Sequence, residues 1–434
     1  MKFHSTNKKS KNFSLPEILC KGLAPDGGLF MPDRWPKMPK DFFAKLESLS
    51  FRQIAFSVAK NFTNEIPAKK LKAIISDAFN FPAPLRQIGP NLFVLELFHG
   101  PTMAFKDFGA RFLARSLGYF LQGQKTTLNI IVATSGDTGS AVASGFFNVP
   151  NIKVFILYPS GKVSPLQEKQ LTTYGGNITA LEVKGSFDDC QKLAKQVLSD
   201  TELNKAMPFS SANSINFGRL LPQSLYYFWA CAQLKALGLN QPPVILVPSG
   251  NFGNLFAGLM AKKMGLPVYK FVAATNINDI VPKYLQTGKF GAKKSKKTIS
   301  NAMDVGNPSN FARILELFNG DYKLMGQNIA GYRVTDRDTK KTIKSIYQKT
   351  KYICDPHTAV GVTAAIRFKG RQDERPIVVL STAHPAKFRE IVERVVNKRI
   401  LLPKQLRRAM KKKKRSVCIK NNYQDLKKVL LQNV

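Results

Sequence analysis

The sequence has few of the residues that build metal centres or disulfide frameworks. Its 434 residues include four histidines and five cysteines, and no two cysteines form a CxxC pair. A structural zinc site needs clustered ligands of these types, and a disulfide scaffold needs a higher density of cysteine. We therefore expect no structural metal and a reducing compartment, which makes the cytoplasm the expected location.

Long hydrophobic runs are also missing. No stretch approaches the roughly 18 consecutive apolar residues of a membrane-spanning helix. The basic start MKFHSTNKKSKNF is not followed by the apolar segment of a secretory signal. With 44% hydrophobic residues, the chain has the apolar content of a globular protein with a large core. We expect no membrane partner.

Acidic residues are scarce, because 28 Asp and Glu stand against 66 Lys and Arg and leave a net charge of +38. This balance is typical of nucleic-acid-binding proteins, so a polybasic binder that has lost catalysis is one hypothesis. The excess is scattered, however, and only GAKKSKKT at 291–298 and RRAMKKKKR at 407–415 are dense clusters. Extra lysine on solvated surfaces explains scattered charge more simply. We expect weak, salt-sensitive binding to polyanions and no specific nucleic-acid partner.

What the sequence does contain, from about residue 128, is an alternation of apolar runs and helical patterns. Five apolar runs are each followed by a turn and a helix-like stretch: NIIVAT, KVFILYP, ITALEVKG, PVILVPS and PIVVLST. This alternation predicts an α/β protein whose parallel strands are covered by helices on both faces. Ligands bind such sheets beyond the carboxyl ends of the strands, where the turns converge.

Four regions are expected along the chain. An N-terminal element with helical stretches covers residues 1–92, and an α/β domain covers residues 93–215. A second α/β domain covers residues 216–402, and a basic, weakly amphipathic C-terminal tail, on the surface, covers residues 403–434.

The stretch PSGNFGN at 248–254 follows an apolar strand and opens a helix. Its glycines let an anion approach the backbone closely, and the helix N-terminus supplies unpaired N–H groups. This pattern favours a phosphate-binding loop, and the alternative is a glycine-rich turn without a ligand.

Two further turns carry polar side chains. In TSGDTGSA at 134–141, Asp137 and Thr138 are suited either to a ligand site or to capping the next helix. In SSANSINFGRL at 210–220, Arg219 is suited to a bidentate bond with a phosphate or carboxylate, or is a surface arginine beside a cap.

A lysine stands among aromatic residues in FHGPTMAFKDFGARF, where Phe105 and Phe108 flank Lys106. Burial disfavours an ammonium and leaves a free amine, which is the form that reacts with an aldehyde. A lysine that extends from a helix end to solvent is the alternative. His99 is either catalytic or hydrogen-bonded in the core, and the second reading is favoured.

Nucleotide-binding motifs do not fit. GYFLQGQKTT at 118–127 resembles a phosphate-binding P-loop, but Gln124 separates Gly123 from Lys125, and the segment precedes a strand instead of following one. The GxGxxG of dinucleotide-binding folds is absent as well.

Six motifs in this order and spacing resemble the threonine synthase family, in its longer bacterial and fungal subgroup. They are HGPTMAFKDFG, TSGDTG, SANSINFGRL, PSGNFGN, NAMDVGNPSNF and STAHPAKF, and the likeness runs to about residue 402. The resemblance implies two doubly wound α/β domains of the tryptophan-synthase β-like fold, which is fold type II of the pyridoxal-phosphate enzymes. It also implies a lyase of threonine biosynthesis that converts O-phospho-L-homoserine and water into L-threonine and phosphate.

The same resemblance implies roles for individual residues. Lys106 would bind pyridoxal phosphate covalently and move protons, Asp137 would lie near the cofactor ring, and Thr382 would face the pyridine nitrogen. The cofactor phosphate would be held by Gly250, Asn251, Phe252, Gly253 and Asn254. The substrate would be bound by Ser135, Gly136, Thr138, Asn213, Ser214 and Arg219. No role follows for His384 or Lys387.

The resemblance also sets the rival within the fold, a dehydratase or a cysteine-synthase-like β-replacement enzyme. Such enzymes need no site for a substrate phosphate, so Arg219 with Asn213 and Ser214 distinguishes the two. We expect a small-molecule substrate and either a monomer or a homodimer.

Overall fold

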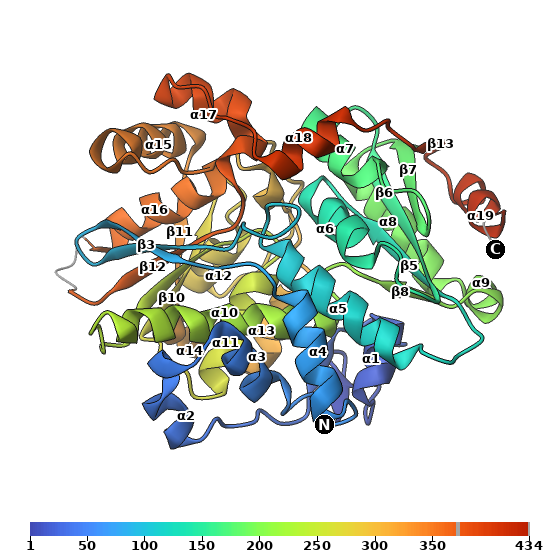
Figure 1. The fold of residues 1–434 in the computed structure, drawn as a ribbon, viewed down its shortest axis with the longest axis horizontal. Helices are drawn as coiled ribbons and strands as arrows, with labels where there is room; N and C mark the ends of the chain where they lie inside the picture. The colour runs from blue at the N-terminus through green and yellow to red at the C-terminus, as the bar shows by residue number, and fades with distance from the viewer. Residues whose placement is uncertain (370–373, 433–434) are drawn as a thin grey trace.

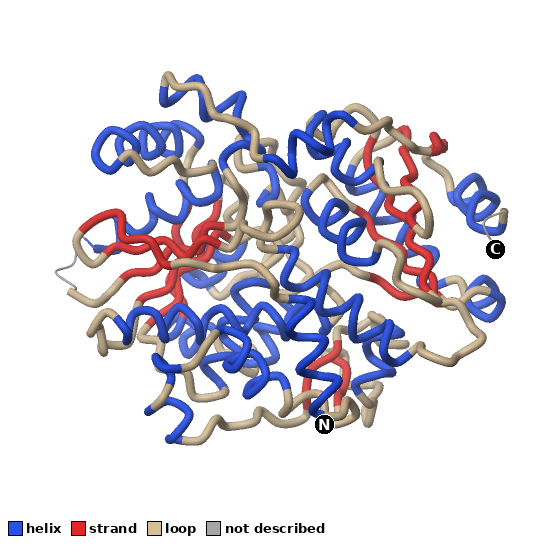
Figure 2. The backbone as a smooth tube through the Cα atoms, in the orientation of Figure 1, coloured by secondary structure: helices blue, strands red, loops and turns tan. Residues whose placement is uncertain are grey.

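The computed structural model describes residues 1–369 and 374–432. Two sheets covered by helices lie side by side, and the N-terminal helices pack beneath both (Figure 1 and Figure 2). Among the described residues, no helix combines the length and the apolar character needed to cross a membrane.

The larger sheet has six strands in the order β11-β10-β9-β12-β4-β3. Neighbouring strands are parallel, except that β3 runs antiparallel to β4. Their bounds are β3 (Leu85–Gly89), β4 (Leu92–Glu96), β9 (Val244–Pro248), β10 (Lys270–Thr275), β11 (Ile329–Arg333) and β12 (Ile377–Ser381).

Helices cover both faces of this sheet. Ile245 and Val247 of β9 pack into the core cluster that contains α10 and α11, whereas Leu246 packs into the cluster that contains α16. Side chains of a strand alternate between faces, so both faces of β9 are apolar and the strand is a continuous hydrophobic run. The helices of this half of the molecule are α10 (Phe217–Ala236), α11 (Gly253–Lys263), α12 (Ile280–Thr287), α13 (Phe311–Leu317), α14 (Tyr322–Asn328), α15 (Asp336–Thr350), α16 (Pro356–Lys369) and α17 (Arg389–Val396).

The smaller sheet has five parallel strands in the order β13-β7-β6-β5-β8. Their bounds are β5 (Leu128–Ala133), β6 (Ile152–Pro159), β7 (Ile178–Lys184), β8 (Phe209–Ser211) and β13 (Val417–Lys420). All six residues of β5 are buried, because helices pack on both of its faces. These helices and their neighbours are α5 (Lys106–Phe120), α6 (Asp137–Phe146), α7 (Pro165–Thr172), α8 (Phe187–Ser199), α9 (Thr201–Ala206), α18 (Lys404–Lys411) and α19 (Tyr423–Leu431).

The N-terminal element supports both halves of the molecule. Its helix α3 packs against α10, and its helix α4 packs against α5. The elements here are β1 (Phe3–Ser5), α1 (Leu15–Lys21), β2 (Phe30–Pro32), α2 (Lys40–Ala44), α3 (Phe51–Ala59) and α4 (Ala68–Ala78). Among the residues that the structure describes, three short 3₁₀ helices complete the list of elements, η1 (Leu46–Ser48), η2 (Asn301–Met303) and η3 (Pro385–Phe388).

The α/β class and the strands expected from the five apolar runs are confirmed, since those runs form β5, β6, β7, β9 and β12. The C-terminal segment is more than the expected basic tail. Its strand β13 extends the smaller sheet by pairing with β7. The sequence signal was weak because only Ile419 of this edge strand is buried, so the period-2 pattern has a single inward residue.

Candidate active site

Lys106 is the first residue of α5, and the loop before it is pinned to the end of β12. The backbone N–H of Phe105 donates to the carbonyl oxygen of Thr382 at 2.9 Å. Ala104 and Ala383 form an antiparallel bridge beside this bond. The carboxyl end of β12 therefore fixes where Lys106 begins its helix, as the parallel-sheet architecture predicts for a ligand site.

The Lys106 amine is unusually weakly basic. Burial lowers its pKa to about 8, the Asp137 carboxylate acts in the opposite direction, and the charges of Arg219 and Lys387 lower it further. A substantial fraction of the amine is therefore neutral near pH 7–8, which is the form required of a nucleophile or a base. This is the setting that the flanking phenylalanines indicated.

The loop after β5 contains Ser135, Gly136, Asp137 and Thr138, and its Asp137 interacts with Lys106 and Lys387. The Oγ1 of Thr134 accepts hydrogen bonds from the N–H groups of Gly136 at 2.9 Å and Gly139 at 2.8 Å. Gly136 has a φ of 144°, and an added Cβ would lie 2.7 Å from the side chain of Gln167. The turn therefore requires glycine, and it leaves Ser135 and Thr138 partly exposed.

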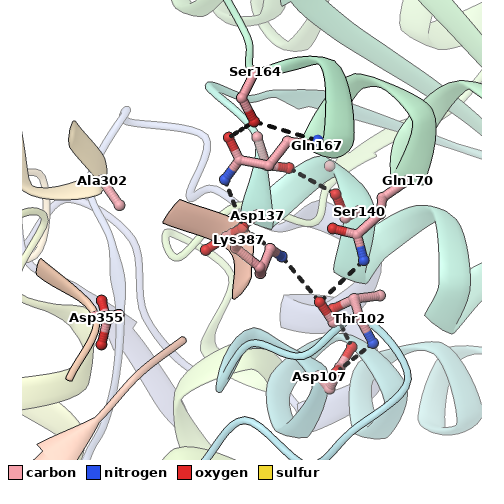
Figure 3. A network of polar contacts seen from close by, with 12 residues as sticks. Thr102, Asp107, Asp137, Ser140, Ser164, Gln167, Gln170, Ala302, Asp355 and Lys387 are labelled. Atoms are coloured by element: carbon pink, nitrogen blue, oxygen red, sulfur yellow. Dashed lines mark hydrogen bonds and ion pairs between the residues drawn. The ribbon is translucent and has the colours of Figure 1, made fainter. Parts of the chain in front are cut away.

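Asp137 is held by side chains and does not merely cap α6. Its Oδ1 accepts a hydrogen bond from Gln167 Nε2 at 2.8 Å and lies 2.6 Å from the Lys387 ammonium (Figure 3). Burial alone would raise its pKa, but the charges of Lys387 and Lys106 outweigh burial and lower the pKa to about 2. Asp137 is therefore an ionised carboxylate beside two lysines.

The loop between β9 and α11 contains a glycine that packs against backbone and a residue with a positive φ. A Cβ on Gly250 would lie 2.7 Å from Met303 Cα and 2.8 Å from the Ala302 carbonyl oxygen, so only glycine fits against that backbone. Phe252 adopts a left-handed conformation with a φ of 60°. A non-glycine residue in this region is strained, and such strain is concentrated at functional sites.

Asn254, in the first turn of α11, retains an unused donor. Its Oδ1 accepts hydrogen bonds from the hydroxyls of Tyr226 at 2.6 Å and Tyr227 at 2.7 Å. Its buried Nδ2 has no hydrogen-bond partner among the described residues. A buried donor without a partner is costly, so an anion at this helix N-terminus would satisfy it.

Ser214 has a hydroxyl whose direction follows from its neighbours. Its Oγ accepts hydrogen bonds from Asn251 Nδ2 at 2.9 Å and from Asn310 Nδ2 at 3.0 Å. Both amide orientations are fixed, because Asn251 Oδ1 accepts from the Ser309 N–H and Asn310 Oδ1 accepts from the Arg313 guanidinium. A hydroxyl has two acceptor lone pairs and one donor, so Ser214 keeps its O–H free to donate elsewhere.

Asn213 and Arg219 make backbone contacts. The side-chain amide of Asn213 donates to the Ala133 carbonyl at 2.9 Å and accepts from the Ala133 N–H at 3.3 Å. The buried Arg219 donates to the carbonyls of Ala212 at 2.5 Å and Lys106 at 3.4 Å. Arg219 thus ties the first residue of α5 to the loop after β8, and its contact with a substrate phosphate stays a prediction.

Three further residues that the sequence singled out, Thr382, His384 and His99, differ in burial. Thr382 is buried at the end of β12, and its carbonyl is the acceptor for Phe105. Burial lowers the pKa of His384 to about 4, so this imidazole is neutral. His99 is only partly buried and bonds to Glu96 at 2.8 Å.

Sequence reasoning left Lys387 without a role and did not single out Thr102, Gln167 or Arg313. The carbonyl oxygen of Thr102 accepts hydrogen bonds from the Lys387 ammonium at 2.9 Å and from Gln170 at 3.1 Å (Figure 3). Lys387 stands in the STAHPAKF motif, so the sequence draws attention to it. Its partners come from distant segments of the chain, so the sequence could not identify them.

A second network, anchored by Arg313, holds the loop at 301–311. The fully buried Arg313 donates to the carbonyls of Phe30 at 3.1 Å and Ile215 at 2.6 Å. The N–H of Ala302 donates to His357 Nε2 at 3.2 Å, and His357 Nδ1 bonds to Asp355 at 2.7 Å. These contacts fix the backbone that faces Gly250 and the asparagine that faces Ser214.

Together these parts fit a phosphate-bearing aldehyde cofactor. The weakly basic Lys106 amine suits the aldehyde, and the Gly250–Asn254 turn with the unused donor of Asn254 suits the phosphate. The fit rests on donors and space that the chain itself provides.

Comparison with known proteins agrees with this chemistry. Residues 78–383 match the family model described as "Pyridoxal-phosphate dependent enzyme". Residues 2–79 match "Threonine synthase N terminus", and residues 358–430 match "Threonine synthase, C-terminal". The likeness therefore continues beyond residue 402, where the sequence motifs ended.

Individual relatives span nearly the full chain. The threonine synthase of Escherichia coli (strain K12) is 44% identical over 407 residues, which are 94% of each chain. That of Buchnera aphidicola subsp. Baizongia pistaciae is 42% identical over 434 residues, covering both chains completely. The crystal structure of threonine synthase with bound pyridoxal phosphate from Brucella melitensis matches with a TM-score of 0.93 and 36% identity, covering 100% of this chain and 99% of that one. The chain therefore belongs to the threonine synthase family of pyridoxal-phosphate-dependent enzymes.

Proposed function

We propose that this chain converts O-phospho-L-homoserine and water into L-threonine and phosphate, with pyridoxal phosphate as its cofactor. The observation that carries the proposal is a weakly basic lysine, Lys106, between an ionised Asp137 and the end of β12, in a chain of this family. The remaining residues supply two kinds of anion-binding donors.

Lys106 would hold the cofactor and transfer the protons. When bound, pyridoxal phosphate supplies an electron sink that stabilises negative charge next to the substrate nitrogen. A lysine with a pKa of about 8 is near the optimum for a group that must both remove and return protons around neutral pH. Lys106 starts α5, and the preceding residue, Phe105, bonds to Thr382, so the backbone at Lys106 is anchored to the end of β12.

The Gly250–Asn254 turn would bind the cofactor phosphate. The α11 N-terminus contributes unpaired N–H groups, and Asn254 contributes its unused Nδ2. No lysine or arginine stands within this turn, so charge is balanced by the backbone dipole and neutral donors. Thr382 would lie at the pyridine nitrogen, where a hydroxyl, unlike a carboxylate, leaves that nitrogen unprotonated.

A second group of donors would bind the substrate phosphate. Ser214 has a free O–H, because Asn251 and Asn310 occupy both of its lone pairs. Ser135 and Thr138 are partly exposed on the loop after β5, where a substrate carboxylate would meet hydroxyl and N–H donors. Donors that stay fixed while negative charge builds on the departing phosphate lower the barrier for its loss.

A dehydratase or β-replacement enzyme of the same fold would not need the second group of donors. We assign the free O–H of Ser214, which two side-chain amides and a buried arginine orient, to the phosphate of a phosphorylated substrate. We also propose that the protein acts in the cytoplasm, as a monomer or a homodimer. Analytical ultracentrifugation of the holoenzyme distinguishes the two assemblies.

The deciding experiment measures release of phosphate and threonine from O-phospho-L-homoserine by the holoenzyme. We expect equal amounts of both products, a loss of at least about a thousandfold in rate for Lys106→Ala, and full activity for Lys125→Ala, an exposed lysine. Bound cofactor without phosphate release would instead identify a β-replacement or dehydratase activity. If the protein binds no cofactor and shows no turnover, but binds nucleic acid in a way that depends on residues 407–415, the polybasic alternative is the correct one.

A further inference from the structure

Lys387 is a second lysine at the site, and the mechanism above does not use it. Its side chain is 0% exposed, and that of its partner Asp137 is 5% exposed. The ammonium lies 2.6 Å from Asp137 Oδ1 and donates to the Thr102 carbonyl at 2.9 Å (Figure 3). Burying an ammonium costs several kcal/mol, and these two contacts offset that cost.

The ion pair joins the two sheets of the molecule. Lys387 lies in η3, which follows β12 of the six-stranded sheet, whereas Asp137 begins α6, which follows β5 of the five-stranded sheet. Gln167 of α7 donates to the same Oδ1 at 2.8 Å. The carboxylate is thus held from both sides, and its direction is fixed relative to both sheets.

Lys106 and Lys387 share this one carboxylate. Asp137 attracts positive charge to Lys106 and raises its pKa, while Lys387 and Arg219 lower it. The other charged or titratable groups that interact with Lys387 are Asp107, whose own pKa burial raises to about 6, and His384, whose pKa burial lowers to about 4. His384 is neutral near pH 7. Asp107 is largely ionised there, but its charge is shared with Arg111 and Arg219, so cationic groups still outnumber carboxylates around the two lysines.

The charge count explains why a neutral residue would not serve at position 387. With Asp137 as the sole partner of Lys106, the carboxylate would stabilise an ammonium there and remove the base. With Lys387 already paired to Asp137, a proton on Lys106 would create an excess positive charge in a buried site. The two lysines therefore compete for Asp137, and the one in direct contact with this carboxylate is Lys387, which makes a proton on Lys106 less favourable.

We propose that Lys387 is a positioning residue for this reaction: its ammonium anchors the Asp137 carboxylate between the two sheets and keeps a second positive charge from Lys106. This inference deepens the proposed function and rests on Lys106 being the cofactor-bearing base.

The test uses the holoenzyme without substrate. Protonation of the Lys106 nitrogen that is bonded to the cofactor changes the visible absorbance, so a pH titration of the spectrum reports the charge at Lys106 directly. We expect Lys387→Met to raise the midpoint by about one pH unit and Asp137→Asn to lower it by about one, as charges within a few ångströms do. Lys387→Arg keeps the charge and should leave the midpoint within about 0.3 units. The double variant, which removes both charges, should return close to the native midpoint.

A structural role alone gives a different pattern. If Lys387 only held the two sheets together, Lys387→Met and Asp137→Asn would lower the melting temperature together and leave the midpoint unchanged or shifted in one direction. That result overturns the proposal. Should Lys387→Met not fold, the other variants decide, because an unshifted Asp137→Asn midpoint is equally contradictory.

The pH dependence of turnover provides a second reading. The acidic limb of kcat/KM follows the pKa of the base, so Lys387→Met should move this limb to higher pH and reduce the rate at pH 7 by about tenfold. The spectral titration needs no substrate. If Lys387→Met raises the midpoint and Asp137→Asn lowers it, but the native holoenzyme releases no phosphate, this inference stands and the proposed function is refuted.

Discussion

The side-chain amide of Asn310 donates to Oγ of Ser214 at 3.0 Å, from a loop almost a hundred residues later in the chain. Asn251 donates to the same oxygen at 2.9 Å. The serine can then only donate, and what it donates to is a ligand or water. The first prediction concerns the loss of this hydroxyl.

Ser214→Ala removes the common acceptor of two amides. We expect a loss of about 1–3 kcal/mol in stability, since unsatisfied buried donors carry that penalty. We also expect inorganic phosphate to inhibit about tenfold more weakly, because a charge-assisted hydrogen bond contributes on the order of 1.5–3 kcal/mol. Scanning calorimetry and inhibition constants measure the two effects. Ser199→Ala, at an exposed position of α8, is the control; unchanged phosphate inhibition in Ser214→Ala would contradict the donor assignment.

Gly250→Ala tests the proposed cofactor-phosphate turn. The new methyl group would lie 2.7 Å from Met303 Cα and 2.8 Å from the Ala302 carbonyl, and backbone cannot yield as a flexible side chain would. Overpacking of this kind costs about 1–3 kcal/mol, so we expect pyridoxal phosphate to bind at least about tenfold more weakly. Equilibrium dialysis measures this affinity. Gly291→Ala, where an added Cβ meets no atom within 4 Å, should bind as the native chain does; equal affinity in Gly250→Ala would place the cofactor phosphate elsewhere.

His4 should make the stability of the protein depend on pH. Its ring nitrogens lie 2.6 Å from Asp33 and 2.5 Å from Glu316, joining β1 to α13. The hydrogen bond to Glu316 is the main cause of a pKa raised above the ordinary 6.5, against the opposing effect of burial. Because the folded pKa is raised, the ion pairs stabilise fully below pH 6.5 and lose this contribution as the pH rises through the folded value.

The substitution His4→Gln therefore has a predicted sign. At pH 6 the variant should be less stable by about 1 kcal/mol, and the difference from the native chain should shrink at high pH. Melting temperatures between pH 6 and pH 10 show this trend. Lys11→Gln, a change at an exposed position of the N-terminal element, should give a small difference in melting temperature that is constant with pH. A difference for His4→Gln that grows with pH would refute the assignment.

Lys414 should anchor the C-terminal segment through ion pairs. Its ammonium lies 2.7 Å from Glu168 and 2.6 Å from Glu182, which connects the segment before β13 to α7 and β7. We expect Lys414→Met to lower the stability by about 1 kcal/mol, an effect that salt weakens. Lys413→Met, at the exposed neighbouring position, should have little effect.

The pH window of this anchor follows from Glu182. Burial would raise its pKa, but hydrogen bonds from Lys414, Ser160 and Tyr158 outweigh burial and lower it to about 2. Because the folded pKa of Glu182 is lowered, its ion pair contributes fully to stability above the unfolded value of 4.5. This contribution is lost as the pH falls toward 2. The difference between native and Lys414→Met chains should therefore narrow between these limits in acid unfolding curves, and a constant difference would contradict the ion pairs.

Much of the fold follows from local pattern. Five apolar runs bounded by glycine and polar turns became strands, because buried parallel strands need side chains that are apolar on both faces. Lys106 among phenylalanines indicated a weakly basic amine, and PSGNFGN at a helix start indicated an anion turn. These features depend on neighbours in the sequence, so composition and spacing are enough to find them.

Other parts were set by contacts between distant segments. The edge strand β13 pairs with β7 across more than two hundred residues, and its single buried side chain, Ile419, left almost no periodic signal. Arg219 suggested a phosphate ligand by type, yet its guanidinium bonds to two backbone carbonyls. Only the tertiary structure could assign those partners, because hydrogen-bond geometry is not written in residue type.

The sequence by itself determined the class of fold and the family likeness and supplied the candidate for the reactive lysine, since each follows from short patterns and their order. The tertiary structure decided how charge is shared at the site. Lys387, Asp137 and Lys106 are separated by as many as 281 residues in the chain. The 2.6 Å contact between Lys387 and Asp137 exists only because η3, after β12, meets the start of α6, after β5, in the folded chain. Coulombic coupling depends on distance in space, and that distance is a property of the packed sheets.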